Sequence, residues 1–444
     1  MSSILICISP AESHVSPILD VVRAFASRGH HVRVLTGARF AERVRALDAE
    51  PIALPREADI LDELDLRERP RGRRAINEGL TEAFIRPAEA QLPALVAALA
   101  AEHTDAIVID PTILAAQLLG RDRPLIACCG IFPLSISSVD TPPFGLGMAP
   151  PRNGLERLRG RLMAWMARKV VLTGVHRDLD AFYTEHGMPG LGELFFTDYI
   201  FQPGVVDVYG QFTVPSFEYP RSDLPAHLHF FGPLASTAAP RPLPAWWNDL
   251  DDTRPVVHVS QGTVGNSDFS ELIAPTLAAL ADEPVTVVVT TGGGTDGRIV
   301  GELPPLPANA VAADFVPYDQ LMPRVSAFVT NGGYGGLQCA LAAGAPIVVA
   351  GDTEDKIETS ARVAWSGAGI NLRTGHPTAG AIRKAVREVL TEPRYRRASA
   401  RIAAEIAASP GAAGFAAEVE RMIADRAGNA ASTVPATRVE GQAG

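Results

Sequence analysis

Residues 327–349 read AFVTNGGYGGLQCALAAGAPIVV and contain two apolar runs, residues 327–330 and 346–349. Both runs are short, continuous and mainly apolar, which is typical of strands buried in a parallel sheet. Between them lie a loop with four glycines, residues 331–336, and a stretch of helical composition. Strand, loop, helix and strand in this order predict one unit of an α/β fold.

The same alternation occurs in both halves of the chain. The predicted strands are residues 3–9, 31–36, 106–110 and 124–129 in the first half, and residues 256–260, 285–289, 327–330 and 346–349 in the second. Helical stretches separate these strands, as they do in doubly wound parallel sheets. We therefore expect two α/β domains.

The length of 444 residues also favours two large domains over one. Residues 216–247 are rich in proline and aromatic residues and lack helical periodicity. They are predicted to link an N-terminal domain, residues 1–215, to a C-terminal domain, residues 248–409. A final helix is expected over residues 410–426. Residues 427–444 contain almost no large apolar side chains and are expected to form a disordered tail.

Composition excludes several classes of protein. With 40 basic and 50 acidic residues the formal net charge is −10, so the protein gains little from the counterion release that drives nucleic-acid binding, and DNA and RNA are poor partners. Four scattered cysteines do not form a disulfide framework or a metal-binding pattern, and they suit a reducing cytoplasm. The N-terminus lacks the features of a signal peptide, and no stretch is long and apolar enough to span a membrane. We expect a cytoplasmic protein.

Ligands of open parallel sheets bind beyond the carboxyl ends of the strands, so polar residues there are candidate functional groups. His14 lies in the loop after the first strand, and Asp110 ends the strand at residues 106–110. A neutral imidazole can take a proton from a hydroxyl near neutral pH when a carboxylate holds its other nitrogen. His14 and Asp110 are therefore a candidate catalytic pair, with a helix cap and a loop tether as their alternative roles.

Two glycine-rich loops follow strands of the second half. Residues 260–266, SQGTVGN, offer backbone N–H groups and the Thr263 hydroxyl to an anion. Residues 330–336 open a helix, whose N-terminus favours negative charge. Both are candidate phosphate loops, although the first alone is equally well explained as a plain turn. Neither contains the lysine of a P-loop, which argues against an ATPase, and no G-x-G-x-x-G follows the first strand, which argues against a dehydrogenase.

At this point three segments of the chain, residues 13–17, 217–234 and above all 315–369, resemble the family-1 nucleotide-sugar glycosyltransferases of the bacterial natural-product type. The resemblance covers about residues 1–426. It implies the GT-B fold, in which two Rossmann-like domains face each other across a cleft. It also implies that His14 is the catalytic base and that Asp110 orients it.

The resemblance assigns the donor site to the C-terminal domain. There Phe315 would stack on the nucleotide base, Val316 would pair with the base through its backbone, and Asp355 would bind hydroxyls of the donor sugar. For Phe315 the alternative role is a core residue. The full set of implied donor-binding residues is Gly262, Thr263, Phe315, Val316, Asn331, Gly333, Tyr334, Gly335, Gly336, Asp355 and Lys356.

Three positions depart from the family pattern. Asn331 replaces a histidine that contacts the diphosphate, and its amide can donate a hydrogen bond but carries no charge. Cys339 replaces a glutamate that grips the ribose, a contact that a thiol cannot make. Lys356 replaces a glutamine and adds a positive charge, either toward the diphosphate or acidic neighbours, or on the solvated surface.

The region expected to bind the acceptor is long, apolar and rich in proline and glycine. Residues 138–154, SVDTPPFGLGMAPPRNG, would suit a lid over a hydrophobic acceptor, and Cys129, Phe132, Phe144 and Met148 are the predicted acceptor pocket. In residues 155–169, basic and apolar residues interleave at helical spacing. We expect this helix to cover the N-terminal domain, the alternative being a weak contact with a membrane surface.

Together these features indicate an inverting, metal-independent glycosyltransferase without a bound cofactor, since the nucleotide sugar is a co-substrate. The expected partners are a UDP- or TDP-sugar and an apolar small molecule with a reactive hydroxyl, and the expected state is a monomer or dimer. An epimerase or hydrolase on the same fold, or a catalytically silent binding partner, are the alternatives. The long apolar loop argues against the first two, and His14 with Asp110 against the third.

Overall fold

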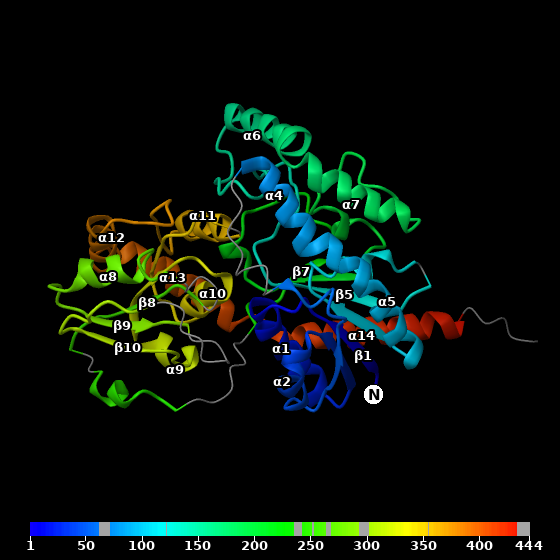
Figure 1. Ribbon diagram of the computed structural model, residues 1–444, viewed down its shortest axis with the longest axis horizontal. Coiled ribbons are helices and arrows are strands. Elements are labelled where there is room, and N and C mark those ends of the chain that lie inside the picture. Colours follow the sequence, from blue (N-terminus) through cyan, green and yellow to red (C-terminus); the bar gives the residue numbers. More distant parts are fainter. Residues whose placement is uncertain are drawn as a thin grey trace, which may run out of the picture.

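The computed structural model describes residues 1–61, 72–120, 122–234, 242–250, 253–262, 268–292, 302–353 and 355–432. These residues form two lobes that lie side by side (Figure 1). Each lobe is built around one parallel sheet, of seven strands in the first lobe and six in the second. The α/β class and the two Rossmann-like domains predicted from the sequence are confirmed.

The first sheet has the strand order β3-β2-β1-β4-β5-β6-β7. Its strands are β1 (Ser3–Cys7), β2 (His31–Thr36), β3 (Glu50–Ala53), β4 (Ala106–Ile109), β5 (Leu125–Gly130), β6 (Val208–Gln211) and β7 (Leu228–Phe230). Cys7 is in register with Ile109, so β1 and β4 end side by side. Whatever follows these two strands therefore meets at one edge of the sheet.

The second sheet has the order β10-β9-β8-β11-β12-β13. Its strands are β8 (Val256–Ser260), β9 (Thr286–Thr290), β10 (Ala310–Ala313), β11 (Val325–Thr330), β12 (Ile347–Val349) and β13 (Gly369–Asn371). Ser260 pairs with Thr330, so β8 and β11 end side by side.

Helices pack on both sheets because the strands present apolar side chains on both faces. Along β1, Ile4 and Ile6 face one core of the first lobe, whereas Leu5 and Cys7 face the other. The helices are α1 (Glu12–Ser27), α2 (Ala41–Arg45), α4 (Gly72–Leu80), α5 (Arg86–Ala101), α6 (Gly154–Met166), α7 (Thr173–Glu185), α8 (Ile273–Leu280), α9 (Tyr318–Leu321), α10 (Tyr334–Ala342), α11 (Lys356–Ser366), α12 (Ala379–Thr391), α13 (Pro393–Ala407) and α14 (Gly411–Ser432).

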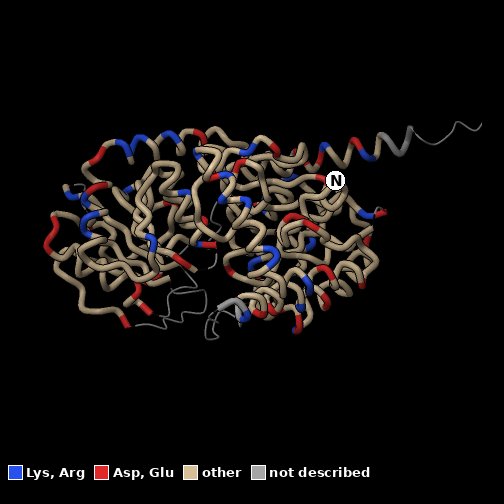
Figure 2. Tube along the Cα trace, turned by 90° about the horizontal axis from the view of Figure 1, so that it is seen from above, with Lys and Arg blue, Asp and Glu red and all other residues tan. Residues whose placement is uncertain are grey.

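Charged residues of both signs are interspersed over both lobes (Figure 2). Of the helices in the described part of the chain, none combines the length and the apolarity that crossing a bilayer requires.

Helix α1 begins earlier than the sequence indicated. It starts at Glu12 and contains Pro17 in its interior. The prediction that His14 lies in a loop is therefore wrong, because His14 belongs to the first helical turn. A proline there removes one helical hydrogen bond, while the apolar face of α1, with Val15, Ile18 and Val22, is fully buried.

The boundaries between the lobes also differ from the prediction. The proposed linker, residues 216–247, contains β7, which is a strand of the first sheet. Val214 and Phe217, which precede β7 in the chain, pack in the core of the second lobe. The chain thus touches the second lobe, returns to the first for β7, and only then crosses over. Proline content and lost helical periodicity indicated irregular structure correctly but not a linker.

The last helix belongs to the first lobe. In α14, Phe415 is fully buried and its ring lies 5.3 Å from the rings of both Phe212 and Phe231. Figure 1 shows α14, in red, running along the first lobe beside α1. The helix continues to Ser432, so the predicted disordered tail at residues 427–444 is wrong for its first six residues. Residues 433–444 lie outside the described part of the chain.

Candidate active site

His14 and Asp110 meet at the carboxyl edge of the first sheet. Nδ1 of His14 lies 3.4 Å from Oδ2 of Asp110, and the Asp110 side chain is fully buried while the imidazole keeps some exposure. Their approach follows from the register of β1 and β4, because Asp110 directly follows β4 and α1 starts shortly after β1. The sequence analysis paired these two residues, and the structure brings them together.

The Asp110 carboxylate is held on both oxygens. Oδ2 accepts the backbone N–H of Ser9 at 2.6 Å, and Oδ1 accepts the backbone N–H of Thr112 at 2.7 Å as well as the Thr112 hydroxyl. Burial alone would raise the pKa of Asp110, but His14 and these hydrogen bonds outweigh burial and hold the pKa below its ordinary value. Asp110 is therefore an oriented, ionised carboxylate beside an imidazole.

The glycine-rich loops of the second lobe meet at Asn331. Its Nδ2 donates a hydrogen bond of 2.6 Å to the carbonyl oxygen of Gln261, which ties the loop after β11 to the loop after β8. Its Oδ1 lies 3.9 Å from the position of a Cβ on Gly262 and 4.0 Å from that of a Cβ on Gly333. One of the two N–H groups of the Asn331 amide is thus directed at Gln261.

A pocket opens beside this junction. Its lining includes Gln261, Asn331, Gly351 and Lys356. Lys356, the first residue of α11, is buried, so the alternative of a solvated surface lysine is wrong. Lys356 therefore places a positive charge next to Gln261 and Asn331, and the uncharged Asn331 amide does not.

The other predicted donor residues have different surroundings. Val316 and Tyr334 are buried in the core of the second lobe, so only their backbones are available to a nucleotide. The Tyr334 hydroxyl instead accepts a hydrogen bond of 3.3 Å from Gln211 of the first lobe. Phe315 is half-buried after β10. The remaining residues are as follows: Gly335 and Gly336 lie in the first turn of α10, Asp355 precedes α11, and Thr263 lies outside the described residues.

Cys339 is the third position that departs from the family pattern. It lies on α10 and packs beside the core of the second lobe together with Tyr318. Burial raises the pKa of its thiol to about 11, with Asp319 adding to the shift. At neutral pH this residue is a neutral thiol.

One of the predicted acceptor residues is wrong. Cys129 is fully buried, because its side chain faces a core cluster to which β5, β6 and α14 contribute. Phe132, Phe144 and Met148 are half-buried and lie on residues 131–153, which connect β5 to α6 and which we call the β5–α6 loop.

The β5–α6 loop docks on the second lobe through Glu358 of α11. Oε1 of Glu358 accepts the backbone N–H groups of Gly145 at 2.8 Å and Gly147 at 2.9 Å. A Cβ on Gly147 would lie 2.8 Å from the carbonyl oxygen of Ile357, so only glycine allows this close approach. The loop that carries Phe144 is thus fixed to the helix that begins with Lys356.

A buried arginine completes this junction between the lobes. Arg362 of α11 contacts Oε2 of Glu358 at 2.7 Å and Oε2 of Glu218 at 2.9 Å. Burial would lower its pKa, but the two carboxylates hold the pKa above the ordinary value. The guanidinium also lies 4.3 Å from the centre of the Tyr219 ring and donates to the carbonyl oxygen of Leu134. These contacts fix the relative position of the two lobes.

The sequence analysis missed Glu218, Glu358 and Arg362. Nothing in the sequence pairs Glu218 with Arg362, which lies 144 residues away. Thr112 could have been found, since a threonine two residues after an aspartate often donates to that carboxylate.

The helix predicted to cover the first lobe does not do so. Within α6 no residue is buried, and its large apolar side chains are exposed. The interleaved pattern indicated a helix correctly, but the assumption that its apolar face meets the core is wrong.

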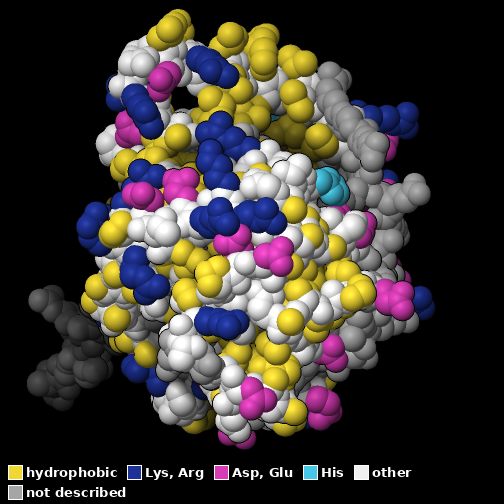
Figure 3. All heavy atoms as spheres, turned by 90° about the vertical axis from the view of Figure 1, so that its left-hand side faces the viewer, with side chains coloured by type: hydrophobic (Ala, Val, Ile, Leu, Met, Phe, Trp, Pro, Cys, Tyr) yellow, Lys and Arg dark blue, Asp and Glu magenta, His cyan; other side chains and the backbone are white. Residues whose placement is uncertain are grey.

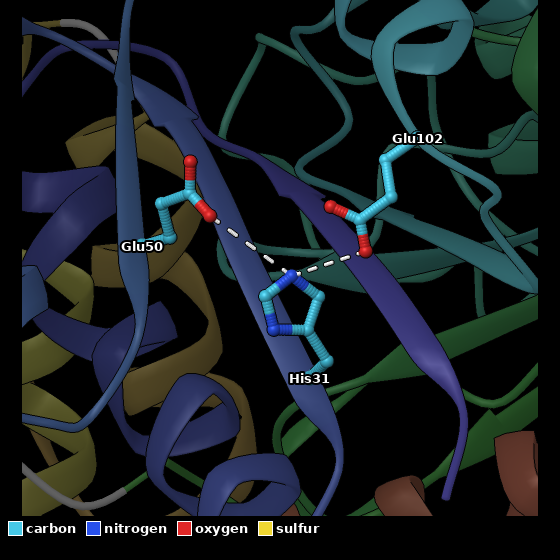
Figure 4. A group of neighbouring side chains, drawn as sticks. All are labelled: His31, Glu50 and Glu102. Carbon is cyan, nitrogen blue, oxygen red and sulfur yellow. Dashed lines mark ion pairs between the residues drawn. The ribbon is translucent and has the colours of Figure 1, made fainter.

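A separate group of potential metal ligands lies at the opposite edge of the first sheet. His31 starts β2, and its Nε2 lies 3.2 Å from Glu102 and 3.9 Å from Glu50 (Figure 4). Glu102 also faces Arg33 at 3.8 Å. Both glutamates are exposed, and the group is explained as ion pairs at the amino-terminal edge, away from His14 and Asp110.

Comparisons with known proteins agree with this architecture. Residues 275–422 match the model of the erythromycin biosynthesis protein CIII-like C-terminal domain. The chain is 40% identical over 416 residues to 4'-demethylrebeccamycin synthase of Lentzea aerocolonigenes, which covers 91% of this chain and 96% of that protein. It is 32% identical over 418 residues to UDP-glucosyltransferase 1 of Beauveria bassiana (strain ARSEF 2860), covering 88% of each.

Among solved structures, CalG4, the calicheamicin glycosyltransferase, has a TM-score of 0.71 at 23% identity, covering 96% of this chain and 98% of that one. At 23% identity this similarity shows the fold alone, whereas the two sequence relatives show the family. The chain belongs to the family-1 nucleotide-sugar-dependent glycosyltransferases of the natural-product type and has their GT-B fold.

Proposed function

We propose that this glycosyltransferase moves a sugar from a UDP- or TDP-sugar to a hydroxyl of an apolar small molecule, with inversion at the anomeric carbon. The observation that carries the proposal is the pair of His14 and Asp110, in which a buried, ionised carboxylate faces Nδ1 of a partly exposed imidazole. A carboxylate on Nδ1 leaves Nε2 as the basic nitrogen. The contact of 3.4 Å is long, and contacts of this kind commonly shorten when substrate binds.

In the proposed reaction Nε2 of His14 accepts the proton of the acceptor hydroxyl while the oxygen attacks the anomeric carbon. The bond from that carbon to the diphosphate oxygen breaks, and its electron pair leaves with the nucleoside diphosphate. Asp110 stabilises the imidazolium that forms. Attack opposite the leaving group inverts the anomeric centre.

Negative charge on the leaving group would be met from the second lobe. The N-terminus of α10, at Gly333, offers backbone N–H groups and a favourable dipole. Lys356 adds a buried cation beside the same pocket. Several relatives are named UDP-glycosyltransferase or UDP-glucosyltransferase, which supports a uridine donor as the first to test.

The acceptor would lie against the β5–α6 loop. Phe132, Phe144 and Met148 give this loop an apolar character, and Glu358 fixes it across the cleft toward α11. An apolar acceptor would exclude water from the transfer site, which protects the donor from hydrolysis.

The test is a transfer assay with UDP- and TDP-sugars against aromatic polycyclic acceptors, read by mass spectrometry, with the anomeric configuration of the product read by NMR. We expect a product that gains one sugar residue with inverted configuration, in the presence of EDTA as well as without it. His14→Ala should retain nucleotide affinity by calorimetry and lose turnover by a factor on the order of 10² to 10⁴. A retained configuration, or full turnover by His14→Ala, would contradict the mechanism, and a strict need for Mg²⁺ would contradict metal independence.

A further inference from the structure

Helix α6 carries a row of exposed apolar side chains. Leu155, Leu158, Leu162, Trp165 and Met166 are 77%, 64%, 57%, 52% and 43% exposed. Their spacing places all five on one side of a helix with about 3.6 residues per turn. Such a continuous apolar row on the surface is a mark of a binding surface.

The row faces away from the body of the protein. The residues of α6 that are half-buried are Gly160, Met163 and Ala164, which lie on another side of the helix. The helix thus rests on the protein through small and flexible residues and presents its larger apolar residues outward.

Basic residues border the apolar row. Arg159 lies on one side of it and Arg157 and Arg161 on the other, and Arg168 and Lys169 follow in the next turn. Residues 154–171 contain these five basic residues and one acidic residue, although the whole chain has a net charge of −10. Arg168 and Lys169 also contact Glu193 at 2.6 and 3.0 Å.

Helix α6 forms the top of the molecule in Figure 1. The upper edge of Figure 3 shows hydrophobic side chains gathered there, with Lys and Arg side chains next to them. The exposed surface of α6 is therefore apolar along the row of large side chains and positively charged beside that row.

We propose that α6 docks this glycosyltransferase on the surface of an anionic lipid bilayer. The apolar row would enter the boundary between head groups and acyl chains, and the arginines would contact lipid phosphates. Charge favours this partner over a second copy of the chain, because two α6 helices packed row to row would bring their arginines together. One helix of this kind gives weak, reversible binding. The proposal is independent of the donor and of the catalytic base.

The experiment is co-sedimentation of the full-length protein with vesicles of phosphatidylcholine alone and of phosphatidylcholine with an equal amount of phosphatidylglycerol. We expect binding to the anionic vesicles, little binding to the neutral ones, and release in about 0.5 M salt, where screening shortens the range of the attraction. Leu158→Glu/Trp165→Glu should abolish binding. Arg157→Gln/Arg161→Gln should weaken binding to anionic vesicles on the order of tenfold or more.

Matched controls use residues of the same type elsewhere. Val96→Glu changes an exposed apolar residue of α5, and Arg396→Gln/Arg397→Gln changes two exposed arginines of α13. Both should bind vesicles like the unmodified protein. The proposal is overturned if the unmodified protein stays in the supernatant with both vesicles, or if the α6 variants bind as the controls do. It is also overturned if Leu158→Glu/Trp165→Glu only converts a dimer to a monomer in sedimentation equilibrium.

Discussion

Replacing Asp110 with asparagine should cost both turnover and stability, although the two side chains have nearly the same shape. Each carboxylate oxygen of Asp110 accepts a backbone N–H, from Ser9 at 2.6 Å and from Thr112 at 2.7 Å. An amide has only one oxygen, so in either orientation its NH₂ group faces one of these donors. At least one N–H then loses its partner, which costs about 1–3 kcal/mol where that N–H is buried, as the one of Ser9 is.

The loss of turnover has a separate cause. Without a charge next to Nδ1, the imidazolium of His14 is not stabilised, and the loss should fall within the range on the order of 10² to 10⁴ that general-base assistance provides. Combining Asp110→Asn with His14→Ala should be little worse than His14→Ala alone, because Asp110 acts through His14.

The stability effect should depend on pH in a defined direction. The pKa of Asp110 in the folded protein lies below its ordinary value, so its ionised form stabilises the fold at pH values above about 4, the pKa of an unfolded aspartate. This contribution is lost as the pH falls through the folded-state pKa. The difference in unfolding free energy between the unmodified protein and Asp110→Asn should therefore be full near pH 7 and shrink in acid.

The assay is urea unfolding at several pH values together with transfer kinetics. Asp105→Asn is the matched control, because Asp105 accepts the backbone N–H of Ser3 at 2.8 Å at the other end of the same strand pair, away from His14. The control should keep its turnover. If Asp110→Asn retained full turnover, or if both variants lost turnover equally, the reasoning about the pair would be refuted.

Other perturbations test the junction and the pocket. Arg362→Met leaves Glu358 buried without its cation and leaves Glu218 with only the longer contact to Arg221, at 3.5 Å. It should destabilise the protein by about 3–5 kcal/mol in urea unfolding, whereas Arg387→Met on the surface should leave the midpoint unchanged. Glu358→Gln should raise the KM for the acceptor more than that for the donor, since it loosens the β5–α6 loop; equal changes would contradict this role. Lys356→Gln should weaken UDP binding in calorimetry on the order of tenfold, and unchanged affinity would remove Lys356 from the donor site.

The fold was largely predictable because parallel sheets require continuous apolar strands. Residues 31–36 and 256–260 coincide with β2 and β8 to the residue. By contrast, β7 has three residues, is exposed at its centre and lies in a proline-rich stretch, so no local pattern indicated it. Its position depends on pairing with β6, a tertiary contact.

The candidate site was predictable where local sequence determines position. His14 and Asp110 follow strands that the register aligns, so their meeting follows from topology. The direction of a side chain is harder to predict, and Cys129 shows why. It lies near the end of a strand buried on both faces, and nothing in its neighbours indicates which of the two cores its thiol faces.

The return of α14 to the first lobe has a practical consequence for engineering. Exchanging the lobes of two transferases with a single cut assumes that each lobe is one continuous piece of chain. Here a cut near residue 248 would separate Phe415 from Phe212 and Phe231 and expose a fully buried aromatic cluster. A recombinant hybrid that keeps this first lobe should therefore carry two pieces of this chain, residues 1–234 and residues 411–432, with only the intervening segment replaced.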